Sequence, residues 1–386
     1  MGGLVARCMI QKIALLDGKD PRALVAKFFT YGTPHGGIVF TSGLLNWFED
    51  VVGPAGSDIF SPPKMIGYLD PRHEYGDEAT EEDHWDPRSI PKDVFDTDNV
   101  FCLVGTDSKD YGISKTVVGP QSDGLVRVEN AYVRGAHRAF AFKAHSGSYG
   151  EVNSEEGYQN LRRFLFGRWK VRVDLADLPR DPVDEDADGD SVIWQLEMRL
   201  TVRGLSVVLS EQMSDQQNPI QLNDELKTLL DSPAHPVPLA TTFLLDLRNP
   251  LRDVPSVEEE VITKHHGISR YSLVLRILKL RERHRFFVFG EHLEQVFDWA
   301  DAAIFDVGPN ASGDGLQAWA NWNSTVEGAL EDFDPTKTQQ PRHTALLDKG
   351  LWQFDLPFAE SRSRTVPILG ENAKLRVTVA DRAAEG

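Results

Sequence analysis

The chain has 386 residues, 41% of them hydrophobic and 26% charged, a composition typical of a globular protein with a packed core. Acidic residues outnumber basic ones by 59 to 41, which gives a formal net charge of −18. Because nucleic acids and anionic membranes bind basic surfaces, this balance argues against both as partners. The length favours two domains of roughly 150 residues or more each.

Cys8 and Cys102 are the chain's cysteines, and each lies in an apolar segment. Two isolated thiols form neither a disulfide framework nor a Cys/His cluster, so we expect structural side chains and no metal or cofactor. No apolar run approaches the roughly 18 residues that cross a bilayer, and the first residues do not read as a signal peptide. We therefore expect a cytoplasmic protein without a transmembrane segment.

Predicted helices and strands alternate over residues 1–175. A helix is predicted from Gly2, because apolar side chains recur there at the helical period. Buried strands are predicted at 27–32, 99–105 and 139–145, the last of which ends on a histidine, and a helix is predicted at 153–169. Alternation of this kind predicts a parallel sheet covered by helices.

Residues 176–190 are predicted to form an acidic linker. The segment 184–189 has the Asp-x-Asp-x-Asp-Gly pattern that opens a calcium loop, but Gln195 stands where the closing glutamate belongs and no helix precedes it. A solvated linker is therefore favoured over a calcium site. Beyond it, apolar and polar residues alternate at 193–202, 271–280 and 374–379, which predicts a β-rich, sandwich-like domain over 191–386.

Four short motifs stand out in the first 150 residues. Met1-Gly2-Gly3-Leu4-Val5-Ala6-Arg7 resembles the segment that follows the nucleophile in lipases reading Gly-His-Ser-Met-Gly-Gly-Leu-Val-Ala-Arg. One helix later, Gly32-Thr33-Pro34-His35-Gly36-Gly37 resembles the family's Gly-Thr-Pro-His segment. Ser122-Asp123-Gly124-Leu125-Val126 resembles its acid loop, and His145-Ser146-Gly147 resembles its histidine loop.

Together these motifs resemble those of α/β-hydrolases of the lipase and esterase type. The resemblance implies a partial α/β-hydrolase sheet over 1–175 and a serine carboxylic-ester hydrolase that works through an acyl-enzyme. His145 would be the base, Asp123 its acid, and the backbone amide of Met1 an oxyanion donor in a chain extended at its N-terminus. The serine would stand immediately before Met1, so the chain beginning at Met1 is expected to be inactive. The substrate would be an ester or a lipid-like small molecule.

The residues themselves leave alternatives open. Asp107 and Asp110 lie nearer the end of their predicted strand and are rivals of Asp123 as the acid. His35 is interpreted as a residue at the rim of the site. Residues 38–98 would form a cap whose apolar side chains either line an acyl pocket or pack on the sheet, namely Leu44, Leu45, Trp47 and Phe48.

Two further hypotheses concern the whole protein. The first is a degenerate, non-catalytic hydrolase-fold scaffold that carries a β-sandwich binding domain, although the presence of both Asp123 and His145 argues mildly against it. The second is thioesterase, amidase or acyltransferase chemistry on the same residues, which the sequence does not separate from ester hydrolysis. No protein partner of the β-rich domain is predicted.

Overall fold

The computed structural model describes residues 1–38, 59–72, 85–108, 121–179, 191–223, 236–245, 256–283, 292–310, 316–338, 345–348, 350–363 and 367–382. The chain divides into two compact units. Unit 1 comprises Met1–Leu165 and Gln216–Asn218, and unit 2 comprises Phe166–Asp215 and Pro219–Gly386. None of the helices in the described ranges has the length and apolarity needed to cross a lipid bilayer.

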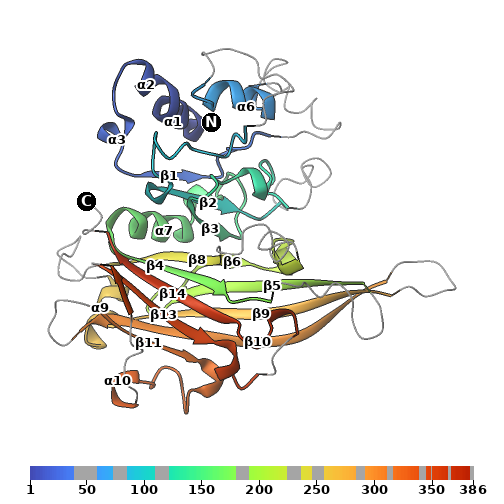
Figure 1. Cartoon of the computed structure of the whole chain (residues 1–386), viewed down its shortest axis with the longest axis vertical. Coiled ribbons are helices and arrows are strands. Elements are labelled where there is room, and N and C mark those ends of the chain that lie inside the picture. Colours follow the sequence, from blue (N-terminus) through green and yellow to red (C-terminus); the bar gives the residue numbers. More distant parts are fainter. Residues whose placement is uncertain are drawn as a thin grey trace. The chain divides into compact units, whose positions relative to one another are not determined.

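Unit 1 is built on a parallel sheet (Figure 1). Its strands, in spatial order, are β1 (Phe28–Tyr31), β2 (Val100–Gly105) and β3 (His137–Ala141). Every residue of the central strand β2 is buried, as in parallel sheets covered on both faces. The prediction of a parallel sheet with helices is thereby confirmed.

The third strand is shorter than predicted. β3 ends at Ala141, and the amide of Lys143 donates to the carbonyl of Ala141 at 2.7 Å, which turns the chain out of the sheet. His145 therefore lies in the loop after β3, and the prediction that it ends the strand was wrong.

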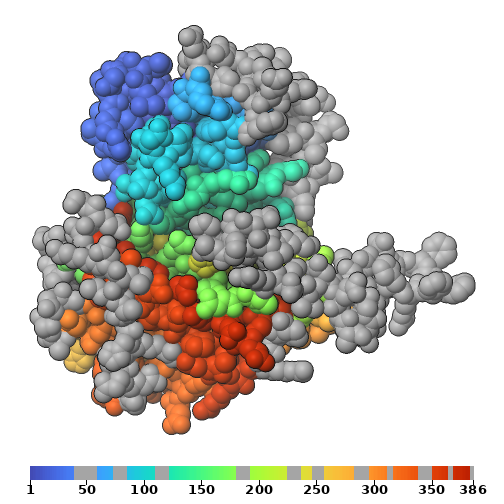
Figure 2. Space-filling view, in the orientation of Figure 1, coloured from blue at the N-terminus to red at the C-terminus, as the bar shows by residue number. Residues whose placement is uncertain are grey.

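The helix predicted from Gly2 is present. The α- and π-helical segments described in unit 1 are α1 (Gly2–Cys8), a π-helical turn (Met9–Ile13), α2 (Ala14–Leu16), α3 (Pro21–Leu24), α6 (Pro62–Leu69) and α7 (Glu155–Phe166). Helix α6 lies against the first helical segment, because Gln11 donates to the carbonyl of Leu69 and Lys12 to that of Gly67. Figure 2 shows the two segments in contact, in light and dark blue. Helix α6 is the described helical part of the predicted cap, whose residues Leu44, Leu45, Trp47 and Phe48 lie outside the described residues.

Helix α7 stops earlier than predicted. It ends at Phe166, and β4 (Gly167–Ala176) begins at the next residue. From Val171 the apolar side chains alternate, with Val171, Val173 and Leu175 buried in the core of unit 2. The segment 167–176 thus belongs to the β-rich unit. The calcium-like segment 184–189 lies outside the described residues, and Gln195 lies in a strand.

Unit 2 consists of two antiparallel sheets, as the β-rich prediction requires. One has the order β11-β10-β9-β5-β6, with β7 paired to β5, and the other has the order β12-β13-β14-β4-β8. The strands are β5 (Ser191–Val202), β6 (Val208–Gln212), β7 (Ile220–Gln221), β8 (Val237–Leu245), β9 (Ser269–Arg283), β10 (His292–Pro309), β11 (Leu316–Trp322), β12 (Ala345–Asp348), β13 (Leu351–Pro357) and β14 (Lys374–Asp381). Among the described residues, unit 2 also contains the short helices α9 (Val257–Lys264) and α10 (Pro335–Thr338).

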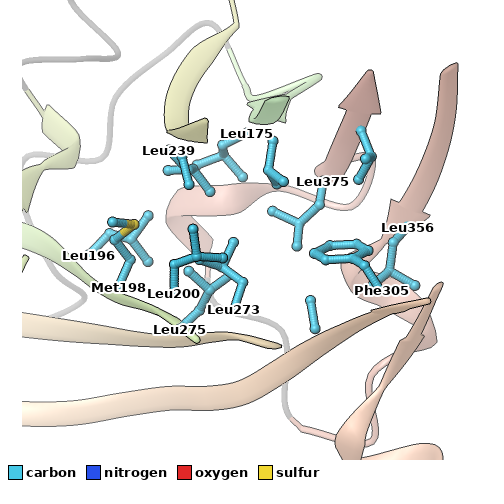
Figure 3. Close-up of a cluster of buried hydrophobic side chains, with 14 of the residues drawn as sticks. Leu175, Leu196, Met198, Leu200, Leu239, Leu273, Leu275, Phe305, Leu356 and Leu375 are labelled. Carbon is cyan, nitrogen blue, oxygen red and sulfur yellow. The ribbon is translucent and has the colours of Figure 1, made fainter. Parts of the chain in front are cut away.

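The two sheets share one apolar core (Figure 3). Leu200 and Leu273 of the first sheet belong to the same buried cluster as Leu175, Leu239 and Leu375 of the second. Burial of apolar side chains from both sheets is the main force that holds such a layered structure together.

Candidate active site

Asp123 and His145 lie together after the carboxyl ends of two neighbouring parallel strands, β2 and β3. Nδ1 of His145 donates to Oδ2 of Asp123 at 2.7 Å, and the amide of His145 donates to the carbonyl of Asp123 at 2.8 Å. With the proton on Nδ1, Nε2 of His145 is left as the acceptor. The carboxyl end of a parallel sheet is where ligands bind and catalysis occurs in α/β proteins.

The carboxylate of Asp123 is held rigidly. Its side chain is fully buried, and Oδ1 accepts the amides of Leu125 at 2.9 Å and Val126 at 2.7 Å. Gly124, with φ of 95°, closes this tight turn. Oδ2 is therefore aimed at the imidazole, and the Asp-Gly pair in the sequence was a sound indication of the turn.

Two carboxyl groups lie within 4 Å of the His145 ring nitrogens in the part of the chain that the structure describes. The first is Asp123. The second is Glu151, and not the rival acid Asp107, whose amide bonds to the carbonyl of Lys143. The other rival, Asp110, lies outside the described residues.

Glu151 was not predicted from the sequence. Its Oε1 lies 3.8 Å from Nδ1 of His145, its side chain is 1% exposed, and neither oxygen has a well-formed hydrogen bond among the described residues, although the backbone amides of Gly32 and Gly105 favour its charged form. Burial, reinforced by the charge of Asp123, raises the pKa of Glu151 well above its usual range. No motif marks this residue, since only the folding of the loop after His145 brings it back to the ring.

Glycines at the ends of β1 and β2 make room for these three side chains. A Cβ on Gly32 would lie 2.9 Å from both Oδ2 of Asp123 and Nδ1 of His145, and would overlap Oε1 of Glu151. A Cβ on Gly105 would lie 2.8 Å from Cβ of Asp123. Gly32 also has a φ of 45°, which favours glycine.

The start of α1 lies beside the same strand end. A Cβ on Gly3 would lie 3.0 Å from Cβ of Thr33, the residue that follows Gly32. The carbonyl of Met1 accepts the amide of Leu4 at 2.9 Å, so Met1 occupies the N-cap position of the helix. Burial lowers the pKa of the amino group of Met1.

His35 is a structural residue and does not lie at a rim. The ring is fully buried, with Nδ1 3.3 Å from Arg7 and Nε2 3.2 Å from the hydroxyl of Thr30. Arg7 is buried too and donates to the carbonyls of Pro87 and Ser89. Burial first, and then the charge of Arg7, lowers the pKa of His35 well below its usual value, so the ring is neutral.

Other groups with possible chemistry are less well placed. Both cysteines are free, and burial raises the pKa of each thiol, which disfavours the nucleophilic thiolate. Donor atoms of Asp123, His145 and Glu151 lie within 4.8 Å of one another, close enough to surround a metal ion. The direct hydrogen bond already joins Nδ1 of His145 to Oδ2 of Asp123, however, so the arrangement is that of an acid–base pair.

Comparison of the chain with protein-family models, with curated proteins and with solved structures finds no match.

Proposed function

We propose that this chain carries the acid and the base of a serine carboxylic-ester hydrolase of the α/β-hydrolase type. The observation that carries the proposal is the 2.7 Å hydrogen bond from His145 to a buried, doubly amide-bound Asp123 after the carboxyl ends of parallel strands. A base oriented by a fixed carboxylate is the arrangement that activates a hydroxyl nucleophile.

In the proposed reaction, Nε2 of His145 takes the proton of a serine hydroxyl as the serine oxygen attacks the ester carbonyl. The carbon–oxygen bond to the alcohol then breaks, and His145 returns the proton to the leaving alcohol. Water, activated by the same ring, hydrolyses the acyl-enzyme. Asp123 keeps the imidazole in the Nδ1–H tautomer and stabilises the imidazolium that forms.

The nucleophile is proposed to stand immediately before Met1, as the resemblance to the lipase segment implies. The packing of Gly3 on Thr33 supports this, because it brings the start of α1 to the strand end where Gly32 contacts Asp123 and His145. The amide of Met1 would then donate to the oxyanion. The substrate would be an ester or lipid-like small molecule.

Labelling with a fluorophosphonate probe tests the proposal. A protein extended at Met1 by its natural reading frame should be labelled at a serine in that extension and should hydrolyse short p-nitrophenyl esters. His145→Ala should reduce the rate on the order of 10⁴-fold or more and abolish labelling, since the members of such a triad act as a unit. His265→Ala, in unit 2, is the control and should be labelled normally. Labelling of the chain that begins at Met1, or of the extended His145→Ala variant, would overturn the assignment.

A further inference from the structure

Among the described residues, two carboxyl groups lie beside the imidazole of His145, and the proposed reaction assigns a role to Asp123 but none to Glu151. It is more deeply buried than His145, whose side chain is 23% exposed. Its oxygens lie against Gly32 and Gly105 without a well-formed hydrogen bond among the described residues. A buried carboxyl without a well-formed hydrogen bond costs stability, so its position calls for an explanation.

The loop after β3 is folded so as to bring Glu151 back to the ring. The amide of Glu151 donates to the carbonyl of Ala144 at 2.9 Å, and that of Gly150 donates to the carbonyl of Gly147 at 3.1 Å. Gly150 is required there, because a Cβ would lie 2.7 Å from the backbone of Ser146. The hydroxyl of Ser154 then donates to the carbonyl of Glu151 at 2.7 Å and fixes the residue ahead of α7.

The charges around Glu151 decide which of the two acids is ionised. The titratable groups that face it among the described residues are Asp123, His145 and Tyr31, whose own pKa is raised by burial and by Glu151. Asp123 has two amide hydrogen bonds and the imidazole, whereas the amides of Gly32 and Gly105 favour the charged form of Glu151 only weakly. Burial and the nearby charge of Asp123 raise the pKa of Glu151, which favours the neutral form of this carboxyl.

We propose that Glu151 is a reserve acid for His145, a carboxyl held neutral by the presence of Asp123 and able to pair with the imidazolium when Asp123 does not. The inference rests on the proposed role of His145 as the base. When the charge of Asp123 is removed, Glu151 releases its proton to solvent as His145 gains one, and an ion pair forms across the 3.8 Å that separates them. Glu151 is thus a positioning residue that acts through the ring of His145.

The test is an NMR titration of His145 in the chain as it stands, which needs neither serine nor substrate. The ring signals are assigned by their loss in His145→Gln. Glu151→Gln alone should move the pKa of His145 by less than about 0.3, because a neutral acid is replaced by a neutral amide. In the Asp123→Asn background, the same substitution should lower the pKa of His145 by more than about one unit, because it removes the remaining carboxyl that lies beside the ring among the described residues.

The matched control is Glu156→Gln, on the adjoining turn of the same segment. Glu156 pairs with Lys143 at 3.4 Å, and its replacement should leave the titration of His145 unchanged in both backgrounds. Equal effects of Glu151→Gln in both backgrounds, or no effect in either, would overturn the proposal. If the double variant fails to fold by near-ultraviolet circular dichroism, Asp123→Asn alone decides. The His145 resonances of this variant should then titrate close to those of the unchanged protein, and a fall of more than about one pH unit would overturn the proposal. Because no catalysis is measured, these outcomes stay separate from the test of ester hydrolysis.

Discussion

At the scale of single residues, burial together with hydrogen bonding decides which polar groups near the carboxyl end of the parallel sheet are charged. His35 and Glu151 are both fully buried and both neutral, one because its pKa falls and the other because its pKa rises. Asp123 is as deeply buried, but it gains two amide donors and an imidazole. Hydrogen-bond partners, rather than depth, distinguish these groups.

The neutral His35 predicts a pH dependence of stability. In the folded protein its pKa lies well below the ordinary value of about 6.5 that it regains on unfolding. Between the two values only the unfolded state binds the proton, so the free energy of unfolding falls as the pH drops below about 6.5, by up to about 1.4 kcal/mol per pH unit. Urea unfolding at pH 7.5 and pH 5.5 should show a smaller loss for His35→Gln than for the unchanged protein. Identical losses would mean that His35 is not neutral in the fold.

At the scale of elements, the sequence predicted those helices and strands whose apolar residues recur at a regular spacing. The helical period after Gly2 and the alternation in β5, β9 and β14 were enough to place those elements. The start of β4 was missed because Trp169, four residues after Leu165, continues the helical spacing of the apolar face of α7. Glu151 was missed because its meeting with His145 depends on a loop closed by hydrogen bonds to Ala144 and Gly147, which no spacing in the sequence records.

The strand-end glycines yield a prediction with an internal control. Gly32 and Gly18 both have positive φ, at 45° and 68°, but a Cβ on Gly18 would meet nothing within 4 Å. Gly18→Ala should therefore cost about 1 kcal/mol of unfolding free energy, for backbone strain alone. Gly32→Ala adds a methyl group among Asp123, His145 and Glu151, and overpacking brings the cost to roughly 2–4 kcal/mol with altered His145 resonances. Equal losses of unfolding free energy in the two variants would show that the side chains around Gly32 accommodate a methyl group without overpacking.

At the scale of the whole molecule, the two units have separate cores. The buried clusters of unit 1 and the inter-sheet cluster of unit 2 share no residue. Their spectroscopic signals also differ, because α1, α6 and α7 belong mainly to unit 1, whereas the described α-helices of unit 2 are α9 and the four-residue α10. Two of the eight tryptophans, Trp47 and Trp85, fall in the sequence of unit 1, and the others fall in that of unit 2, namely Trp169, Trp194, Trp299, Trp319, Trp322 and Trp352.

Separate cores predict separate unfolding transitions. Leu273 and Leu69 are both fully buried, the first in the core of unit 2 and the second in that of unit 1, and a leucine-to-alanine change at such a site costs about 2–5 kcal/mol. Leu273→Ala should lower the urea midpoint followed by tryptophan fluorescence and leave the helical signal at 222 nm unchanged, whereas Leu69→Ala should do the reverse. Proteins with more than one core depart from two-state unfolding in this way. If either substitution moves both signals together by the same amount, the units unfold as one cooperative body and the division into two folding units is wrong.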